Sequence, residues 1–98
     1  MKIGIIGGGA WGTTLGQTLI DNGNQVLIYD LNPDAVQKIN AHLHPFFDTV
    51  LPESERATHK LQEVIDFSDM LLLSVPTKAI RSVLKEINSL LNKKTTFI

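Results

Sequence analysis

Three glycines near the start of the chain, Gly7, Gly9 and Gly12, are spaced as G-x-G-x-x-G. An apolar run at residues 2–6 precedes them, and a segment with helical periodicity at residues 10–22 follows. A glycine turn between a strand and a helix is typical of a dinucleotide-binding site. The first glycine permits a sharp turn, the second lets the backbone approach a pyrophosphate, and the third permits close packing of the helix.

A second apolar run at residues 26–29 ends at an acid, Asp30, which lies 18 residues after Gly12. The first N–H groups of such a helix face the phosphates, and its dipole favours their negative charge. An acid at the end of the second strand can accept hydrogen bonds from the adenosine ribose. Bare glycine triplets also occur in structural turns, but here both strands, the helix and the acid are present together. The pattern therefore predicts a site for a dinucleotide.

The remainder of the chain continues to alternate between strands and helices. Asn32 and Pro33 are typical of an N-cap and a first helical residue, and Gly23 is typical of the residue that ends a helix. Gly16 would permit close approach of the first helix to the sheet, and Thr77 can cap the last helix. We expect further helices at residues 33–43, 60–67 and 77–91 and further strands at residues 56–58, 70–75 and 95–98.

This order predicts an α/β fold, a Rossmann-like doubly wound parallel sheet that is truncated after the start of its fifth strand. Ligands of such sheets bind at the carboxyl ends of the strands. We therefore expect residues 7–11, Asp30 and the segment Val75-Pro76-Thr77 to converge there.

Composition excludes several classes of function. The chain has 98 residues and a net charge of −1, and its basic residues are not clustered. These features predict one domain that binds neither nucleic acid nor a membrane surface. No cysteine is present, so disulfides are excluded, and we expect a cytoplasmic protein. No apolar run approaches the ~20 residues that span a bilayer.

Other chemistry-bearing side chains are interpreted as structural. His42 and His44 are two residues apart and do not share a helix face, so we interpret them and His59 as surface or loop residues rather than metal ligands. Lys78 is interpreted as a solvated lysine at a helix start rather than a phosphate contact. The acids near a predicted helix and turn are interpreted as non-catalytic: Glu63, Asp66 and Asp69.

Residues 7–15, Gly-Gly-Gly-Ala-Trp-Gly-Thr-Thr-Leu, resemble the glycine turn of bacterial NAD(P)-dependent glycerol-3-phosphate dehydrogenases, in which the Trp is distinctive. The related 6-phosphogluconate-like and prephenate dehydrogenases usually lack that Trp. The resemblance covers essentially the whole chain and continues at residues 21–26, 32–33, 51–53 and 74–81.

The resemblance implies NAD(H) binding and hydride transfer between dihydroxyacetone phosphate and sn-glycerol 3-phosphate, for phospholipid synthesis. It places Ala10 and Trp11 against the cofactor, although Trp11 could also be a core residue. It further implies that Leu31 lies beside Asp30 in the site. The complete set of expected cofactor-binding residues is Gly7, Gly9, Ala10, Trp11, Gly12, Asp30, Leu31, Phe46, Val75 and Pro76.

Two positions depart from the family. Many relatives have a small residue at position 30 and Arg or His at position 31, which suits the 2′-phosphate of NADP. Here Asp30 would repel that phosphate and Leu31 has no charge, so we expect NAD(H) to be preferred over NADP(H). The Leu-Pro-Gly that usually follows the family's aromatic residue is a further departure, since this chain has Phe46-Phe47-Asp48-Thr49 there.

No residue of this chain matches a catalytic position of the family. The family's lysine beyond the fifth strand would lie past Ile98, and the substrate domain is absent. We therefore expect residues 1–98 to be an incomplete dinucleotide-binding domain, inactive alone, with the small phosphorylated substrate bound only by the full-length parent. Apolar surface exposed by truncation would favour a homodimer. The alternatives are a non-enzymatic nucleotide-binding or assembly module, or the same domain of another 6-phosphogluconate-like dehydrogenase.

Overall fold

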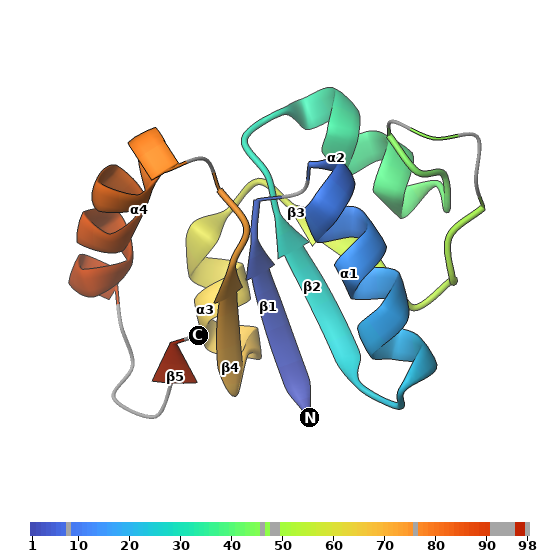
Figure 1. Cartoon of the computed structure of the whole chain (residues 1–98), viewed down its shortest axis with the longest axis horizontal. Helices are drawn as coiled ribbons and strands as arrows, with labels where there is room; N and C mark the ends of the chain where they lie inside the picture. The colour runs from blue at the N-terminus through green and yellow to red at the C-terminus, as the bar shows by residue number, and fades with distance from the viewer. Residues whose placement is uncertain (8, 46, 48–49, 76, 91–95, 98) are drawn as a thin grey trace.

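Strands and helices alternate along the whole chain in the computed structural model (Figure 1). The structure describes residues 1–7, 9–45, 47, 50–75, 77–90 and 96–97. The elements are β1 (Lys2–Ile6), α1 (Ala10–Asp21), β2 (Gln25–Tyr29), α2 (Pro33–Asn40), β3 (Arg56–Thr58), α3 (Leu61–Phe67), β4 (Met70–Leu73), α4 (Thr77–Leu90) and β5 (Thr96–Phe97).

The strands form one parallel sheet in the order β3-β2-β1-β4-β5. β1 lies at its centre, where Ile5 pairs with Ile28 of β2 and with Leu72 of β4. The winding reverses beside β1, because β2 and β3 extend to one side and β4 and β5 to the other. This confirms the predicted Rossmann-like α/β fold.

Helices cover both faces of the sheet, as the apolar runs of the strands require (Figure 1). On one face, α1 packs over β1 and β2, and α2 packs over β3. On the other face, α3 packs over β1 and β2, and α4 packs beside α3. The first core contains Ile3, Ile5, Val26, Ile28, Val36, Ile39, Leu51 and Ala57, and the second contains Ile6, Tyr29, Leu61, Val64, Ile65, Leu71 and Ile87.

The predicted helix ends at Gly23 and Asn32 are confirmed. Gly23 has φ +89°, and its N–H donates to the carbonyl of Ile20 at 2.9 Å, which ends α1. The side chain of Asn32 accepts a hydrogen bond from the Asp34 N–H at 3.0 Å, and Pro33 begins α2.

An asparagine protects the outer edge of the short strand β3. The side-chain amide of Asn40, the last residue of α2, donates to the Ala57 carbonyl at 3.0 Å and accepts from the Ala57 N–H at 2.8 Å. A strand partner would make the same two bonds. The edge of β3 is therefore partly satisfied by a side chain, which limits its pairing with other strands.

The predicted extension of α2 to position 43 is wrong. α2 ends at Asn40, and His42 has φ +66°, a left-handed conformation that stops the helix. Leu43 is consequently exposed, and it pairs with Val50 in an isolated antiparallel bridge.

Other predicted ends are shifted by a few residues. β4 ends at Leu73 rather than at position 75, because its pairing with β1 finishes at Ile6, where the glycine turn leads the chain away. Thr77 is the first residue of α4, and the capping role predicted for its side chain lies outside what the structure describes. Positions 95 and 98 of the predicted last strand lie outside the described residues.

Candidate functional site

The first glycine of the turn joins the ends of three strands. The Gly7 N–H donates to the Tyr29 carbonyl at the end of β2, at 2.8 Å. The Ser74 N–H, just beyond β4, donates to the carbonyl of Ile6 at 2.8 Å. Gly7 has φ +108°, and a Cβ there would collide with the Ser74 carbonyl oxygen and lie 3.0 Å from Val75 Cγ1. Only glycine therefore fits at this junction.

The other two glycines of the motif have opposite surroundings. Gly9 is the N-cap of α1, with φ −62°, and a Cβ there would meet nothing within 4 Å. A Cβ on Gly12 would collide with the Gly7 carbonyl oxygen and lie 3.4 Å from Ile5 Cγ2. Gly12 thus lets the helix pack against the turn itself as well as the strand, while Gly9 leaves open space in front of the helix start.

The first turn of α1 contributes no negative side chain that would offset the helix dipole. That turn contains no acid, and the N-cap of the helix makes no side-chain hydrogen bond. Trp11 is 80% exposed, which excludes the core role that the sequence left open. This end of the helix suits an anionic group, and the indole stands at the surface beside it.

Asp30 and Leu31 follow β2 directly. Asp30 is half-buried, its N–H donates to the Thr58 carbonyl at 3.1 Å, and its Oδ1 accepts from the Asn32 N–H at 2.8 Å. The bond from the Asn32 N–H holds the Asp30 carboxylate in place. Asp30 directly follows Tyr29, whose carbonyl accepts the hydrogen bond from the Gly7 N–H. Leu31 is 77% exposed.

The tyrosine at the end of β2 has an altered pKa. Burial raises the pKa of Tyr29, and the carboxylates of Glu86 and Asp30 raise it further. The phenol is therefore neutral over the physiological range, so β2 presents one negative side chain, Asp30, at its end.

The structure brings the glycine turn, the Asp30 segment and Val75 together at the carboxyl ends of β1, β2 and β4, as the topology predicted. The expected contacts Phe46 and Pro76 lie outside the described residues, and the side chain of Ala10 is likewise not described.

One histidine was interpreted only partly correctly from sequence. His44 was expected at the surface or in a loop; it lies in the segment between α2 and β3, but it is buried at 6% exposure. Its Nε2 lies 3.2 Å from Thr14 Oγ1 of α1, and its Nδ1 accepts from the Phe47 N–H at 3.2 Å. A single histidine in an irregular segment gives no periodicity from which its burial could be predicted.

Two of the acids that were interpreted as non-catalytic have structural partners. Glu63 accepts from Thr58 Oγ1 at 3.0 Å and lies 3.9 Å from Lys60 Nζ, and Asp66 accepts from Gln62 at 2.8 Å. Within the described ranges no group of three or more histidines and acids is placed to hold a metal ion. None of the helices in those ranges is long and apolar enough to cross a membrane.

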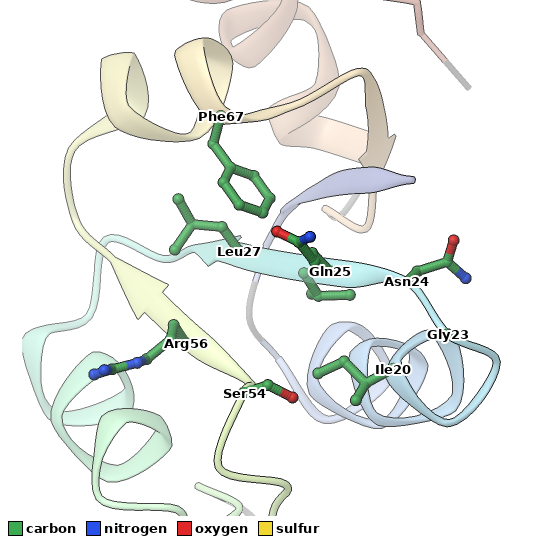
Figure 2. Close-up of a pocket in the computed structure, with 9 residues that line it drawn as sticks. Ile20, Gly23, Asn24, Gln25, Leu27, Ser54, Arg56 and Phe67 are labelled. Atoms are coloured by element: carbon green, nitrogen blue, oxygen red, sulfur yellow. The ribbon is translucent and has the colours of Figure 1, made fainter.

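A surface pocket of about 510 Å³ lies at the opposite edge of the sheet, where β2 and β3 begin (Figure 2). Apolar side chains of Leu27 and Phe67 line one side of it and Ile20 another, and Ser54 and Arg56 complete the wall. The pocket contains none of the glycine-turn residues and is separate from the site described above.

Comparison with known proteins identifies the family. The profile described as the N-terminus of NAD-dependent glycerol-3-phosphate dehydrogenase matches residues 2–98. The chain is 56% identical over 98 residues to glycerol-3-phosphate dehydrogenase [NAD(P)+] of Acholeplasma laidlawii and 46% identical to that of Phytoplasma mali. Each match covers 100% of this chain and 29% of the relative.

Solved structures of two dehydrogenases superpose on nearly the whole chain. The structure of glycerol-3-phosphate dehydrogenase from Coxiella burnetii superposes with a TM-score of 0.87 at 26% identity, over 98% of this chain and 30% of that one. D-mandelate dehydrogenase with NADH and anilino(oxo)acetate superposes with a TM-score of 0.76 at 34% identity, over 99% of this chain and 32% of that one. Together with the glycine turn and its Trp, these matches show that the chain belongs to the NAD-dependent glycerol-3-phosphate dehydrogenase family, whose N-terminal region it represents.

Proposed function

We propose that this chain binds NAD(H) as the cofactor-binding part of a glycerol-3-phosphate dehydrogenase. The observation that carries the proposal is the open space in front of Gly9, at the start of a helix with no acid in its first turn. A pyrophosphate fits such a place because backbone N–H groups and the helix dipole both favour an anion there.

The chain's own residues would bind and orient the cofactor. Gly7 and Gly12 hold the turn in shape, and Gly9 leaves room for the pyrophosphate. Asp30, held by the Asn32 N–H, would accept hydrogen bonds from the adenosine ribose hydroxyls. Trp11, Leu31 and Val75, with Ala10, Phe46 and Pro76, complete the proposed contact set.

The nicotinamide, when bound, supplies the hydride that converts dihydroxyacetone phosphate to sn-glycerol 3-phosphate. The chain spans 29% of the length of the relatives named above. We place binding of this small phosphorylated substrate outside residues 1–98, and the isolated chain is expected to be catalytically inactive. Self-association into a homodimer remains a prediction, which light scattering at high protein concentration tests.

A preference for NAD(H) over NADP(H) follows from two side chains. The Asp30 carboxylate would lie against the 2′ position of the adenosine ribose, where NADP carries a phosphate. Like charges so close repel each other, and the neutral Leu31 offers no compensating charge. The similarity to D-mandelate dehydrogenase, whose structure contains NADH, supports a nicotinamide dinucleotide as the ligand class.

Calorimetric titration with NADH and then NADPH tests both parts of the proposal. We expect saturable binding of NADH and binding of NADPH at least tenfold weaker, since one unfavourable charge contact of about 1.4 kcal/mol gives that ratio. Equal affinities would contradict the role of Asp30. Absence of NADH binding by folded protein would contradict the proposed function itself.

A further inference from the structure

A buried acid lies against the helix that begins at the glycine turn. Glu55, the residue before β3, is 0% exposed, and a Cβ added at Gly16 of α1 would lie 2.6 Å from its Oε2. Within the part of the chain that the structure describes, neither carboxylate oxygen of Glu55 has a hydrogen-bond partner. A buried carboxylate without donors is far less costly when it carries a proton. The geometry therefore makes Glu55 a proton-binding group in the interior.

The surroundings of Glu55 contain no cation that would hold it ionised. Burial raises the pKa of Glu55 to about 7, and the negative charge of Asp21, the one charged residue of α1, raises it further. Among the described residues no lysine, arginine or histidine forms an ion pair with Glu55. The other charged or titratable residues of the elements around it are Asp34 and Lys38 of α2, Arg56 of β3, and His42, His44 and Glu53 of the segment between them.

The proposed pyrophosphate site belongs to the same helix. Gly9, in front of which the space is open, precedes Gly16 by seven residues, so a rise of ~1.5 Å per residue places Glu55 about 10 Å from the start of α1. α1 packs directly over β1 and β2, so protein rather than water fills much of that distance. A charge on Glu55 would consequently be screened less than a charge on the surface.

We propose that the dinucleotide and a proton on Glu55 bind cooperatively, because the ionised carboxylate beneath α1 repels the pyrophosphate at the start of that helix and the protonated one does not. The inference rests on the proposed function, since it concerns regulation of the same site. Such coupling is reciprocal, so cofactor binding also draws a proton onto Glu55. An acid with a merely structural role would change the stability of the fold and leave the affinity for the cofactor independent of pH.

Calorimetric titration of the wild-type chain with NADH over a range of pH measures the coupling. Ionic strength is held constant, and circular dichroism at each pH shows that the chain is folded. We expect affinity to fall about tenfold from pH 6 to pH 9, a factor that corresponds to about 1.4 kcal/mol. Coulomb's law gives an energy of this size for two unit charges about 10 Å apart at an effective dielectric constant of about 20.

Proton uptake is a second readout of the same coupling. The titration with NADH is repeated near pH 7.5 in phosphate and in Tris, two buffers with different enthalpies of ionisation. A tenfold coupling predicts uptake of about half a proton for each NADH bound at that pH. Equal binding enthalpies in the two buffers would show that no proton is taken up and would contradict the proposal.

Two variants assign the effect to its residue. Glu55→Gln keeps the shape of the protonated acid and cannot ionise, so it should bind NADH at every pH as the wild type does near pH 6, without proton uptake. Glu53→Gln is the matched control, because Glu53 is an exposed acid two residues earlier in the same segment. Its pH dependence and proton uptake should equal those of the wild type.

Carbon NMR of the Glu55 carboxyl group in the wild-type chain requires no variant. Saturation with NADH should raise the midpoint of its titration by about one pH unit, the equivalent of a tenfold coupling. An unchanged midpoint overturns the proposal even if Glu55→Gln does not fold.

The two levels of the argument fail in different ways. Constant NADH affinity from pH 6 to pH 9 in the folded wild type overturns the coupling and leaves the proposed function intact. An equal pH dependence in Glu55→Gln assigns the effect to another group, such as His42 or His44, and also overturns it. Failure of the folded wild type to bind NADH near pH 6 overturns the proposed function and this inference with it.

Discussion

Gly16 of α1 faces the carboxylate of Glu55 across the first core, and a Cβ at position 16 would lie 2.6 Å from Glu55 Oε2. Glu55 is fully buried, and among the described residues neither carboxylate oxygen has a hydrogen-bond partner. Burial raises the pKa of Glu55 to about 7, and the negative charge of Asp21 adds to the effect. The glycine therefore makes room for a buried acid that is protonated in the folded chain just below neutral pH.

The first prediction is that the chain loses stability as the pH rises. The unfolded state releases the Glu55 proton near pH 4.5 and the folded state near pH 7, so the folded state binds more protons between these values. The stabilisation is complete below pH 4.5 and is lost as the pH rises through 7. From pH 5 to pH 8 we expect the free energy of unfolding to fall by about 2–3 kcal/mol from this group, measured by urea titration.

Glu55→Gln is the control for that measurement, because it keeps the shape of the protonated acid and cannot ionise. The variant should be nearly insensitive to pH over the same range and more stable than the wild type at pH 8. An equal slope in both proteins would show that another group causes the dependence.

The second prediction concerns the room that Gly16 provides. Gly16→Ala should destabilise the wild type by about 1–2 kcal/mol, because the new methyl group meets Glu55 Oε2 and lies 3.4 Å from Ile28 Cδ1. In a Glu55→Ala background the carboxylate is gone, and the gain in helix propensity of up to ~1 kcal/mol should make the same change neutral or favourable. Denaturant midpoints of the four proteins measure the coupling. Equal costs in both backgrounds would contradict it.

The third prediction separates binding from folding within the glycine motif. Gly9→Ala should fold as the wild type does, because φ is −62° and a Cβ has open space around it. It should nevertheless weaken NADH binding at least tenfold, since the methyl group occupies the space assigned to the pyrophosphate. Gly12→Ala should lower the melting temperature strongly, because its Cβ collides with a backbone carbonyl. Wild-type affinity of Gly9→Ala for NADH would argue against the proposed site.

The fourth prediction is a reversal of cofactor preference. Asp30→Ser with Leu31→Arg removes the repelling carboxylate and adds a cation where the 2′-phosphate would lie. NADPH should then bind at least as tightly as NADH in calorimetric titration. Asp34→Asn is the matched control, since Asp34 is an exposed acid in the first turn of α2, and its preference should match the wild type. If the double variant still favours NADH, the recognition of the ribose lies elsewhere.

The backbone conformation was predicted correctly from the sequence wherever the chemistry of neighbouring residues determines it. The glycine turn, the cap at Asn32 and the left-handed Gly23 each follow from conformational preferences of single residues, and the structure confirms them. The parallel sheet follows from apolar runs that alternate with helical patterns. The binding roles assigned to Asp30 and Leu31 stay predictions.

Prediction failed where distant segments decide the structure. Glu55 lies in a short irregular stretch, and its burial depends on the absence of a side chain at Gly16, 39 positions earlier. His44 is buried against α1, where its Nε2 lies 3.2 Å from Thr14 Oγ1. The helical pattern of α2 continued to Leu43, but the chain reversed at His42 and left that leucine exposed.

The central place of β1 has a consequence for synthesis on the ribosome. β1 is made first, and β2 can pair with one of its edges as soon as Tyr29 has emerged. The other edge of β1 stays unpaired until β4 has been synthesised, and the last pair between β1 and β4 joins Ile6 to Leu73. For more than forty further residues the nascent chain therefore carries an apolar strand with an open edge, the kind of surface that chaperones and neighbouring nascent chains recognise.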